Sequence, residues 1–268
     1  MRQAPPLGNK KSEYGHGFEC VNIDKQPGLE HPLLKNHIIQ FFNREPNGPL
    51  GLRVQDKKCP SGRIPVPRRS ISLKKGLKDG PYFYTMIRKV GHFLGTKGIS
   101  TVAYPTVGHD GQFYRCKLWI TGPEGTNQSS IQIGWEVFPK KYGDDMPHFF
   151  TFLTTDSYRT ICYHMECTGY IQVSRIIVPS MIIYQSESAG SQFNIEISIQ
   201  KERQTGNWWV RVGDEYVGYW PKGVLPNVDF AQNITWGCED SEAYVPTMFD
   251  NGHSPHEGLE LNFNNPLP

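Results

Sequence analysis

The stretch SIQIGWEVFPKKYGDD, Ser130 to Asp145, contains the pattern that decides the fold. From Ile131 to Val137, large apolar residues alternate with polar residues or glycine, which is the period-2 pattern of a β-strand with one face in a core. The polar face of this strand carries Gln132 and Glu136. Two residues four positions apart on a strand are separated by about 13 Å, so a partner for either must come from a neighbouring strand.

Similar short runs recur after Thr96, separated by Gly, Pro, Asn or Asp. The aromatic content of 12%, with 27 Gly and 21 Pro, favours short strands and tight turns over a helical bundle. No fixed-period repeat is visible, which argues against a propeller. We therefore predict an all-β protein, an antiparallel β-sandwich or jelly roll. The runs are ISTVAYPTV, QFYRCKLWIT, SIQIGWEVF, HFFTFLTT, YIQVSRIIV, FNIEISIQ, NWWVRV, EYVGYW and NITW.

Residues 1–95 have a different composition. They contain 17 Lys and Arg but only 7 Asp and Glu, whereas the remaining residues contain 11 Lys and Arg and 19 Asp and Glu. The two parts therefore carry opposite net charge and should attract each other. Periodicity is poor before residue 96, although residues 31–42 could form a short strand or helical turn. We expect a small, loosely structured segment at 1–95 and a β-sandwich domain at 96–268. The positive residues are scattered and match no nucleic-acid motif, so no nucleic-acid partner is expected.

Features that bear on location point in two directions. No apolar run approaches the roughly 20 residues that cross a bilayer, so no membrane partner is expected. The N-terminus has no apolar stretch of the kind a secretory signal needs. Six cysteines, and glycosylation sequons at Asn127 and Asn233, are instead typical of the secretory pathway. We expect that a signal was removed or is missing from the sequence.

The cysteines leave alternatives open. CYHMEC, Cys162 to Cys167, includes a histidine and a glutamate and so raises the possibility of a zinc site. A lone short cluster lacks the second half of a structural zinc site, and no metal or other cofactor is expected. Cys116 and Cys238 either bridge two strands or are free thiols, and the sequence does not decide between these states.

Several blocks, in a fixed order along nearly the whole chain, resemble the plant neprosin family of glutamic peptidases, which are made with an N-terminal activation segment. The first part carries CVNIDKQPGLEHPLLKNHIIQ, beginning at Cys20, and CPSGRIPV, beginning at Cys59. The second part carries IQIGWEVFPKKYGDD, TTDSYRTICYHMECTGYIQVS, GNWWVRVGDEYVGYWP and ITWGCE, which ends at Glu239. The resemblance implies an acid-acting endopeptidase that cleaves next to proline, is made as a zymogen, and is secreted or vacuolar.

The resemblance also implies a catalytic pair on adjacent strands, with Glu239 as the base and Gln132 as its partner. In such a pair the glutamate activates a water, while the amide positions that water and stabilises the oxyanion. Gln132 would then line the cleft opposite Glu239, and Glu136 would be a substrate-side or surface residue. Cys238 stands where relatives commonly have glycine, and a side chain there could alter the aim of Glu239.

Further roles follow from the same resemblance. Flat rings in the cleft would accommodate a substrate proline, and the candidates are Trp135, Trp208 and Tyr219. Disulfides are implied between Cys162 and Cys167 and between Cys20 and Cys59. Residues 1–95 would block the cleft as an intramolecular inhibitor until acid weakens their attraction to the acidic domain. The activating cut is expected between about Leu77 and Gly98.

Two alternatives to a peptidase stay open. One is a catalytically inactive neprosin-like sandwich that binds cell-wall glycan or protein. The other is a glycoside hydrolase, since paired carboxylates on a β-sandwich also suit sugar chemistry, but Gln132 removes one of the two acids that this chemistry needs. The separation of the Gln132 and Glu239 side chains discriminates between a peptidase and a binding module.

Overall fold

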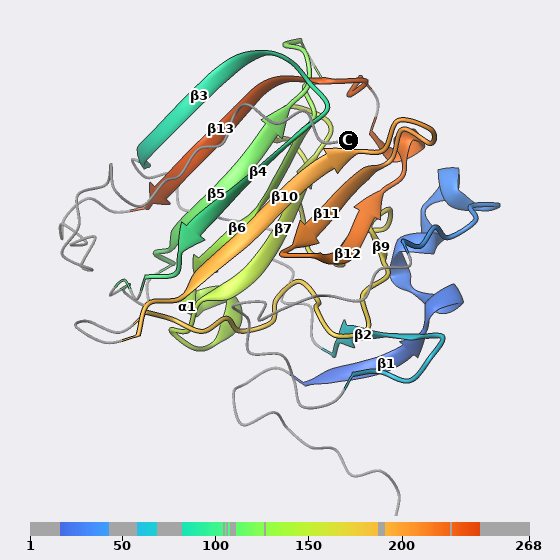
Figure 1. Ribbon diagram of the computed structural model, residues 1–268, viewed down its shortest axis with the longest axis horizontal. Helices are drawn as coiled ribbons and strands as arrows, with labels where there is room; N and C mark the ends of the chain where they lie inside the picture. The colour runs from blue at the N-terminus through green and yellow to red at the C-terminus, as the bar shows by residue number, and fades with distance from the viewer. Residues whose placement is uncertain are drawn as a thin grey trace, which may run out of the picture.

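The structure, a computed structural model, describes residues 17–42, 58–68, 82–103, 105, 107, 111–125, 127–186, 191–225 and 227–241. It confirms the predicted antiparallel β-sandwich, in which two sheets face each other across one core (Figure 1). None of the helices that the structure describes has both the length and the apolar character needed to cross a membrane.

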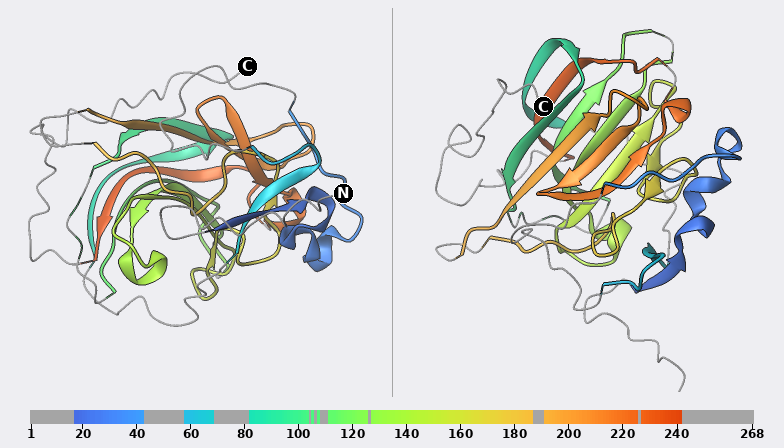
Figure 2. Two further views of the ribbon diagram at one scale, coloured as in Figure 1. Left: turned by 90° about the horizontal axis from the view of Figure 1, so that it is seen from below. Right: turned by 45° about the vertical axis from the view of Figure 1, so that its right-hand side comes forward.

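The larger sheet has six strands, in the order β3-β13-β5-β6-β7-β8, and is strongly curved (Figure 2). Its central strands β13, β5 and β6 pair antiparallel over eight residues at each junction. The strands are β3 (Phe83–Phe93), β5 (Tyr114–Thr121), β6 (Ser130–Val137), β7 (His148–Thr154), β8 (Cys162–Tyr163) and β13 (Ala231–Asp240). A four-residue helix, α1 (Pro139–Tyr142), follows β6.

The smaller sheet has five strands, in the order β4-β10-β11-β12-β9. The strands are β4 (Gly95–Thr101), β9 (Ile171–Gln172), β10 (Asn194–Lys201), β11 (Trp208–Val212) and β12 (Glu215–Trp220). A 3-10 turn, η4 (Lys222–Val224), follows β12. The run YIQVSRIIV forms only two strand residues, because the Gln172 side chain donates to the backbone oxygens of Ser174 and Ile177 and bends the chain.

The core lies between the two sheets and is filled by the apolar residues of the alternating strands. Ile131, Ile133 and Trp135 of β6 are buried there, as are Ile195 and Ile197 of β10. Because β-strand side chains alternate between faces, burying this set directs the polar set of β6 to the opposite face of the six-stranded sheet. That opposite face carries the candidate site.

Strand β3 changes the expected domain boundary. It precedes residue 96, yet it pairs with β13 from Phe83 to Phe93. The sandwich therefore begins no later than Phe83. The pattern of β3 did not reveal a strand of this domain because β3 is an edge strand, exposed on both faces for most of its length.

The described parts of the N-terminal segment form a small unit beside β9 and β12 (Figure 1). Strands β1 (Phe18–Asn22) and β2 (Arg63–Pro67) pair as a two-stranded sheet. They are accompanied by the 3-10 turns η1 (Ile23–Lys25), η2 (Pro27–Glu30) and η3 (Pro32–Leu34). Gln26 docks this unit, because its side chain both accepts from the Gln172 backbone N–H at 2.7 Å and donates to the Gln172 carbonyl at 3.2 Å.

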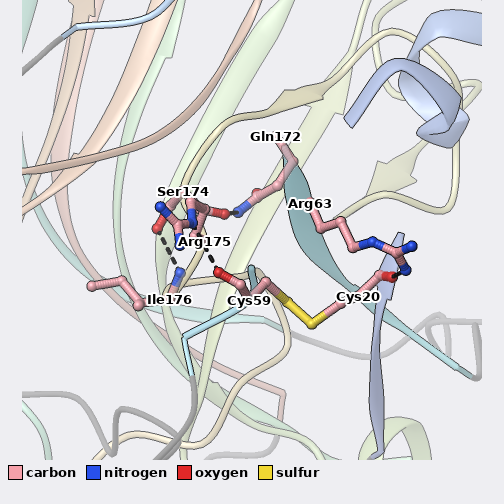
Figure 3. Close-up of a disulfide and its surroundings, with 7 residues drawn as sticks. All are labelled: Cys20, Cys59, Arg63, Gln172, Ser174, Arg175 and Ile176. Atoms are coloured by element: carbon pink, nitrogen blue, oxygen red, sulfur yellow. Dashed lines mark hydrogen bonds between the residues drawn. A yellow bond between two sulfur atoms is a disulfide. The ribbon is translucent and has the colours of Figure 1, made fainter. Parts of the chain in front are cut away.

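A disulfide between Cys20 and Cys59 holds the two arms of this unit together (Figure 3). The Cys59 backbone N–H donates to the Arg175 carbonyl at 3.0 Å, and the Arg175 Nε donates back to the Cys59 carbonyl at 2.8 Å. The disulfide therefore also positions Cys59 for a paired contact with the chain that follows β9.

The end of the unit rests on the outer face of the five-stranded sheet through Tyr219. The Tyr219 hydroxyl accepts from the Gln40 backbone N–H at 3.0 Å and lies 2.7 Å from His37 Nε2. Neutral His37 can accept the hydroxyl proton, whereas protonated His37 cannot. Burial lowers the pKa of His37, because the docked position disfavours the charged ring.

We predict that acid weakens this docking. Below about pH 6.5 the free segment binds a proton more readily than the docked one, so docking is lost as the pH falls through the lowered pKa of His37. The protection of residues 31–42 against hydrogen exchange, relative to unprotected amides at the same pH, should decrease as the pH is lowered from about 7 to about 5 in the wild type. It should decrease much less in His37→Gln. His92→Gln, on exposed β3, is the control. Equal pH dependence in wild type and His37→Gln would contradict the assignment.

Candidate active site

A cleft of about 500 Å³ lies on the face of the six-stranded sheet that points away from the core. Residues of β3, β13, β5, β6 and β7 line it, together with the loop that follows β7. Glu239 and Gln132 both line this cleft, and Lys117 of β5 lies between them. The described residues 17–42 and 58–68 contribute nothing to its walls.

Register explains how these three side chains reach one place. Lys117 pairs with Gly134 of β6 on one side and with Gly237 of β13 on the other. Neither neighbour has a side chain, so the Lys117 side chain has room on both sides. Gln132 and Glu239 lie two residues beyond these glycines on the same face, diagonally across Lys117.

Lys117 connects the two predicted residues directly. Its Nζ donates to Gln132 Oε1 at 2.9 Å and forms a shorter ion pair with Glu239 Oε2. Gln132 Nε2 in turn donates to the Tyr158 hydroxyl at 3.2 Å. Burial lowers the pKa of Lys117 to about 8, although the neighbouring Glu239 carboxylate acts in the opposite direction.

The expectation that the pair stands on adjacent strands is wrong. Glu239 is on β13 and Gln132 is on β6, and β5 is hydrogen-bonded between them. The two side chains meet through Lys117 Nζ, which is within hydrogen-bond distance of both. The site is therefore a row of three groups, Gln132, Lys117 and Glu239, and not a pair.

Glu136 is not a substrate-side residue, because it is fully buried beside the cleft. Its Oε1 accepts from the Tyr142 hydroxyl at 2.6 Å and from Lys141 Nζ at 3.3 Å, and its Oε2 lies 3.5 Å from Arg115 Nε. Burial alone raises the pKa of Glu136, but Lys141 and Arg115 more than offset this, so the pKa lies below its ordinary value. We call Glu136, Arg115, Lys141 and Tyr142 the Glu136 network.

The three rings expected to bind substrate do not line the cleft. Trp135 and Trp208 are buried in the core between the sheets. Tyr219 is buried on the other side of the sandwich, beneath His37 and Gln40. Alternation on each strand explains the error, since the sequence shows that half of the rings point inward but not which sheet face carries the cleft.

Different rings line the cleft. Tyr84 of β3 and Tyr158 are 47% and 46% exposed, so they offer accessible surface to a ligand. Trp119 and Phe152 complete this aromatic wall, and the Lys117 Nζ lies 4.8 Å from the centre of the Trp119 ring. Burial, followed by the Glu239 carboxylate, raises the pKa of Tyr84 to about 12, so this phenol stays neutral.

All six cysteines form disulfides. Cys162 and Cys167 are joined, which removes the thiolates that a zinc site at CYHMEC would need. Cys116 and Cys238 are also joined, which resolves the alternative left open by the sequence. They are directly opposed on β5 and β13, and each immediately precedes a cleft residue, Lys117 or Glu239.

The two sequons differ in accessibility. Asn127 is exposed in the loop between β5 and β6. Asn233 is 4% exposed, and its side-chain nitrogen donates to Thr121 Oγ1 at 3.0 Å. Because Asn233 also lines the cleft, a glycan there would have to occupy it, and the expectation of glycosylation at Asn233 is withdrawn.

Sequence reasoning missed Lys117 and Arg115. The signal was present in YRCKLW, where two basic residues alternate with Tyr114, Cys116 and Leu118 on a strand otherwise read as core. A strand with cations at every second position and apolar residues between them must turn the cations to its other face. Only the pairing of β5 between β13 and β6 shows that they meet the two predicted residues.

The Glu136 network generates a stability prediction. Glu136→Gln removes the carboxylate that compensates Arg115 and Lys141, so the free energy of unfolding at pH 7 should fall by about 3 kcal/mol or more. Chemical denaturation measures this, and the difference from wild type should narrow as the pH falls below the ordinary pKa of a glutamate and through the lowered pKa of the folded Glu136 carboxylate. Glu196→Gln, in an exposed ion pair with Lys97, should cost less than about 1 kcal/mol. Similar losses in both variants would contradict the network.

Comparisons with known proteins place the chain in a family. Among solved structures, a GH16 protein from the Bacteroides ovatus mixed linkage glucan PUL is 13% identical, with a TM-score of 0.36, covering 59% of this chain and 62% of that one. Scytalido-glutamic peptidase, with a transition state analog inhibitor, is 12% identical, with a TM-score of 0.31, and the match covers 60% of this chain and 65% of that one. SCP-B, a member of the Eqolisin family of peptidases, is also 12% identical, with a TM-score of 0.30, and the match covers 60% of this chain and 64% of that one.

The chain thus spans less than two thirds of each of these structures, and likeness at this level carries no argument about activity. The family model is more decisive. The Neprosin model matches residues 110–262, which is more than half of the 268-residue chain and includes every strand of the six-stranded sheet except β3. The chain belongs to the neprosin family.

Proposed function

We propose that the chain is a glutamic endopeptidase, with Glu239 as the general base and Gln132 as its partner. The observation that carries this proposal is the convergence of Glu239, Gln132 and Lys117 on the wall of one cleft in a member of the neprosin family. Glu239 takes a proton from a water as the water attacks the peptide carbonyl. The Gln132 amide stabilises the oxyanion that forms.

The aromatic wall supports a preference for proline in the substrate. Tyr84 and Tyr158 present accessible rings beside Glu239 and Gln132. A pyrrolidine ring is compact and apolar, and it packs well against an aromatic face. This role replaces the one expected for Trp135, Trp208 and Tyr219.

Acid acts at the activation step in this proposal. The N-terminal segment is positively charged and the remainder of the chain is negatively charged, so protonation of carboxylates weakens their attraction. The described parts of the segment contact the outer face of the five-stranded sheet, and blocking of the cleft would depend on residues 1–16, 43–57 and 69–81, which lie outside the described residues. A cut after residue 82 would enter β3, so we place the activating cut within 69–81.

Three disulfides and the exposed sequon at Asn127 support a secreted or vacuolar location, where oxidising conditions preserve disulfides.

One observation favours a second candidate function, a non-catalytic sandwich that binds peptide or glycan in the same cleft. Lys117 forms an ion pair with Glu239 and so satisfies the carboxylate that would otherwise activate a water. If this pair never opens to a water, the cleft retains its aromatic wall and loses its chemistry. Both candidates use the same surface, and only turnover separates them.

The test compares wild type, Glu239→Gln and the control Glu196→Gln at about pH 3 and about pH 7. We expect wild type and control to release a fragment of about 70 to 80 residues at acid pH and to cut a proline-containing peptide, whereas Glu239→Gln does neither. Mass spectrometry reads both events. Binding of the peptide without turnover, equal in wild type and Glu239→Gln after removal of the segment by an added protease, would instead establish the binding module.

A further inference from the structure

Lys117 lies between Glu239 and Gln132, where it can carry to the departing nitrogen the proton that Glu239 takes from water. Cleavage of a peptide bond needs a proton for the departing nitrogen, because an amide nitrogen does not leave as an anion. In a pair of carboxylates, the protonated member can supply this proton. The Gln132 carboxamide has no acidic proton to give. We propose that Lys117 is a catalytic residue that protonates the leaving amine, an inference that rests on the proposed function.

The geometry places Lys117 correctly for this step. Its Nζ is within hydrogen-bond distance of both Gln132 Oε1 and Glu239 Oε2, so it borders any substrate carbonyl that these two groups hold. An ammonium has three donor protons, and two of them are occupied by Gln132 and Glu239. The third remains available to a substrate in the cleft, which Lys117 lines.

The charges around Lys117 allow it to act as an acid near neutral pH. Glu239 faces Lys117 from β13, and Arg115 lies on the same face of β5, two residues away. The buried Glu136 lies opposite Arg115 on β6. Glu239 and Glu136 favour the ammonium, whereas burial and Arg115 disfavour it, and the resulting pKa of about 8 is well below that of an ordinary lysine. Lys117 therefore keeps its proton at and below neutral pH and has one to give.

The step balances in atoms and electrons. A lone pair of the water oxygen forms the new C–O bond, the carbonyl π pair moves to oxygen, and Glu239 takes one water proton. The oxyanion then reforms the carbonyl, the C–N bond breaks with its electron pair on nitrogen, and Lys117 gives that nitrogen a proton. This leaves Glu239 protonated and Lys117 neutral. A proton passes from Glu239 to Lys117 across their direct contact and restores the starting state.

The experiment compares a peptide with the matching p-nitrophenyl ester, whose phenolate leaves without needing a proton. Both substrates use water activation by Glu239, but only the peptide uses Lys117 as an acid. Lys117→Arg keeps a cation that does not deprotonate, and Lys117→Met removes it. We expect both variants to lose at least ~100-fold in kcat for the peptide and less than ~5-fold for the ester. Lys97→Met, from the exposed ion pair with Glu196, should change neither.

A pH profile of the wild type provides a readout that does not depend on variants. The kcat for the peptide should fall above about pH 8, where Lys117 loses its proton, and the kcat for the ester should stay level there. Thermal unfolding of the Lys117→Met/Glu239→Gln double variant, which removes the whole ion pair, reports whether the site folds without it.

The outcomes separate this inference from the proposed function. Three results would overturn the role of Lys117 alone. They are equal losses of kcat on peptide and ester in Lys117→Arg, no loss of kcat on the peptide in that variant, and parallel pH profiles of kcat for the two substrates. A wild type that cleaves the peptide but not the more reactive ester would also overturn it. Failure of the wild type on both substrates, with the N-terminal segment removed, would overturn the peptidase proposal itself.

Discussion

The pairing of β5 between β13 and β6 is the constraint on which the rest of the structure depends. The three strands bury their apolar residues against the five-stranded sheet, so every second residue must face the other way. That requirement gathers cations of β5 and carboxylates of β6 and β13 on one surface. A shift of one residue in the β5–β13 pairing would separate Lys117 from Glu239, and the same shift in the β5–β6 pairing would separate it from Gln132.

Two groups of buried charges result, and they differ in access. The Glu136 carboxylate is closed off from solvent, because it is fully buried, its Oε1 accepts from Tyr142 and Lys141, and its Oε2 faces the Arg115 cation at 3.5 Å. The row of Gln132, Lys117 and Glu239 also pairs a carboxylate with a lysine, but all three of its residues line the cleft. Buried ion pairs are poor stabilisers relative to apolar packing, so their position here is better explained by specificity and chemistry. The Cys116–Cys238 disulfide joins the two strands immediately beside the open row.

The N-terminal segment docks at a place separate from the cleft. Its described part rests on Tyr219, Gln172 and Arg175, on the side of the sandwich away from the cleft. The contacts there combine a titratable histidine with neutral hydrogen bonds, so docking responds to pH independently of the cleft chemistry. In the proposed zymogen, acid would weaken this docking at contacts that lie apart from the cleft.

The sequence by itself determined the all-β class and the period-2 strands, because alternation is a local property of the chain. Gln132 and Glu239 were expected from the resemblance of its blocks to the neprosin family. Sequence reasoning placed Trp135, Trp208 and Tyr219 in the cleft and the domain boundary after β3, because the burial of a ring and the pairing of an edge strand depend on distant segments. The role of Lys117 was missed for the same reason. A cation on a strand becomes part of a site only when its neighbours across the sheet are known, and strand order is a property of the tertiary structure alone.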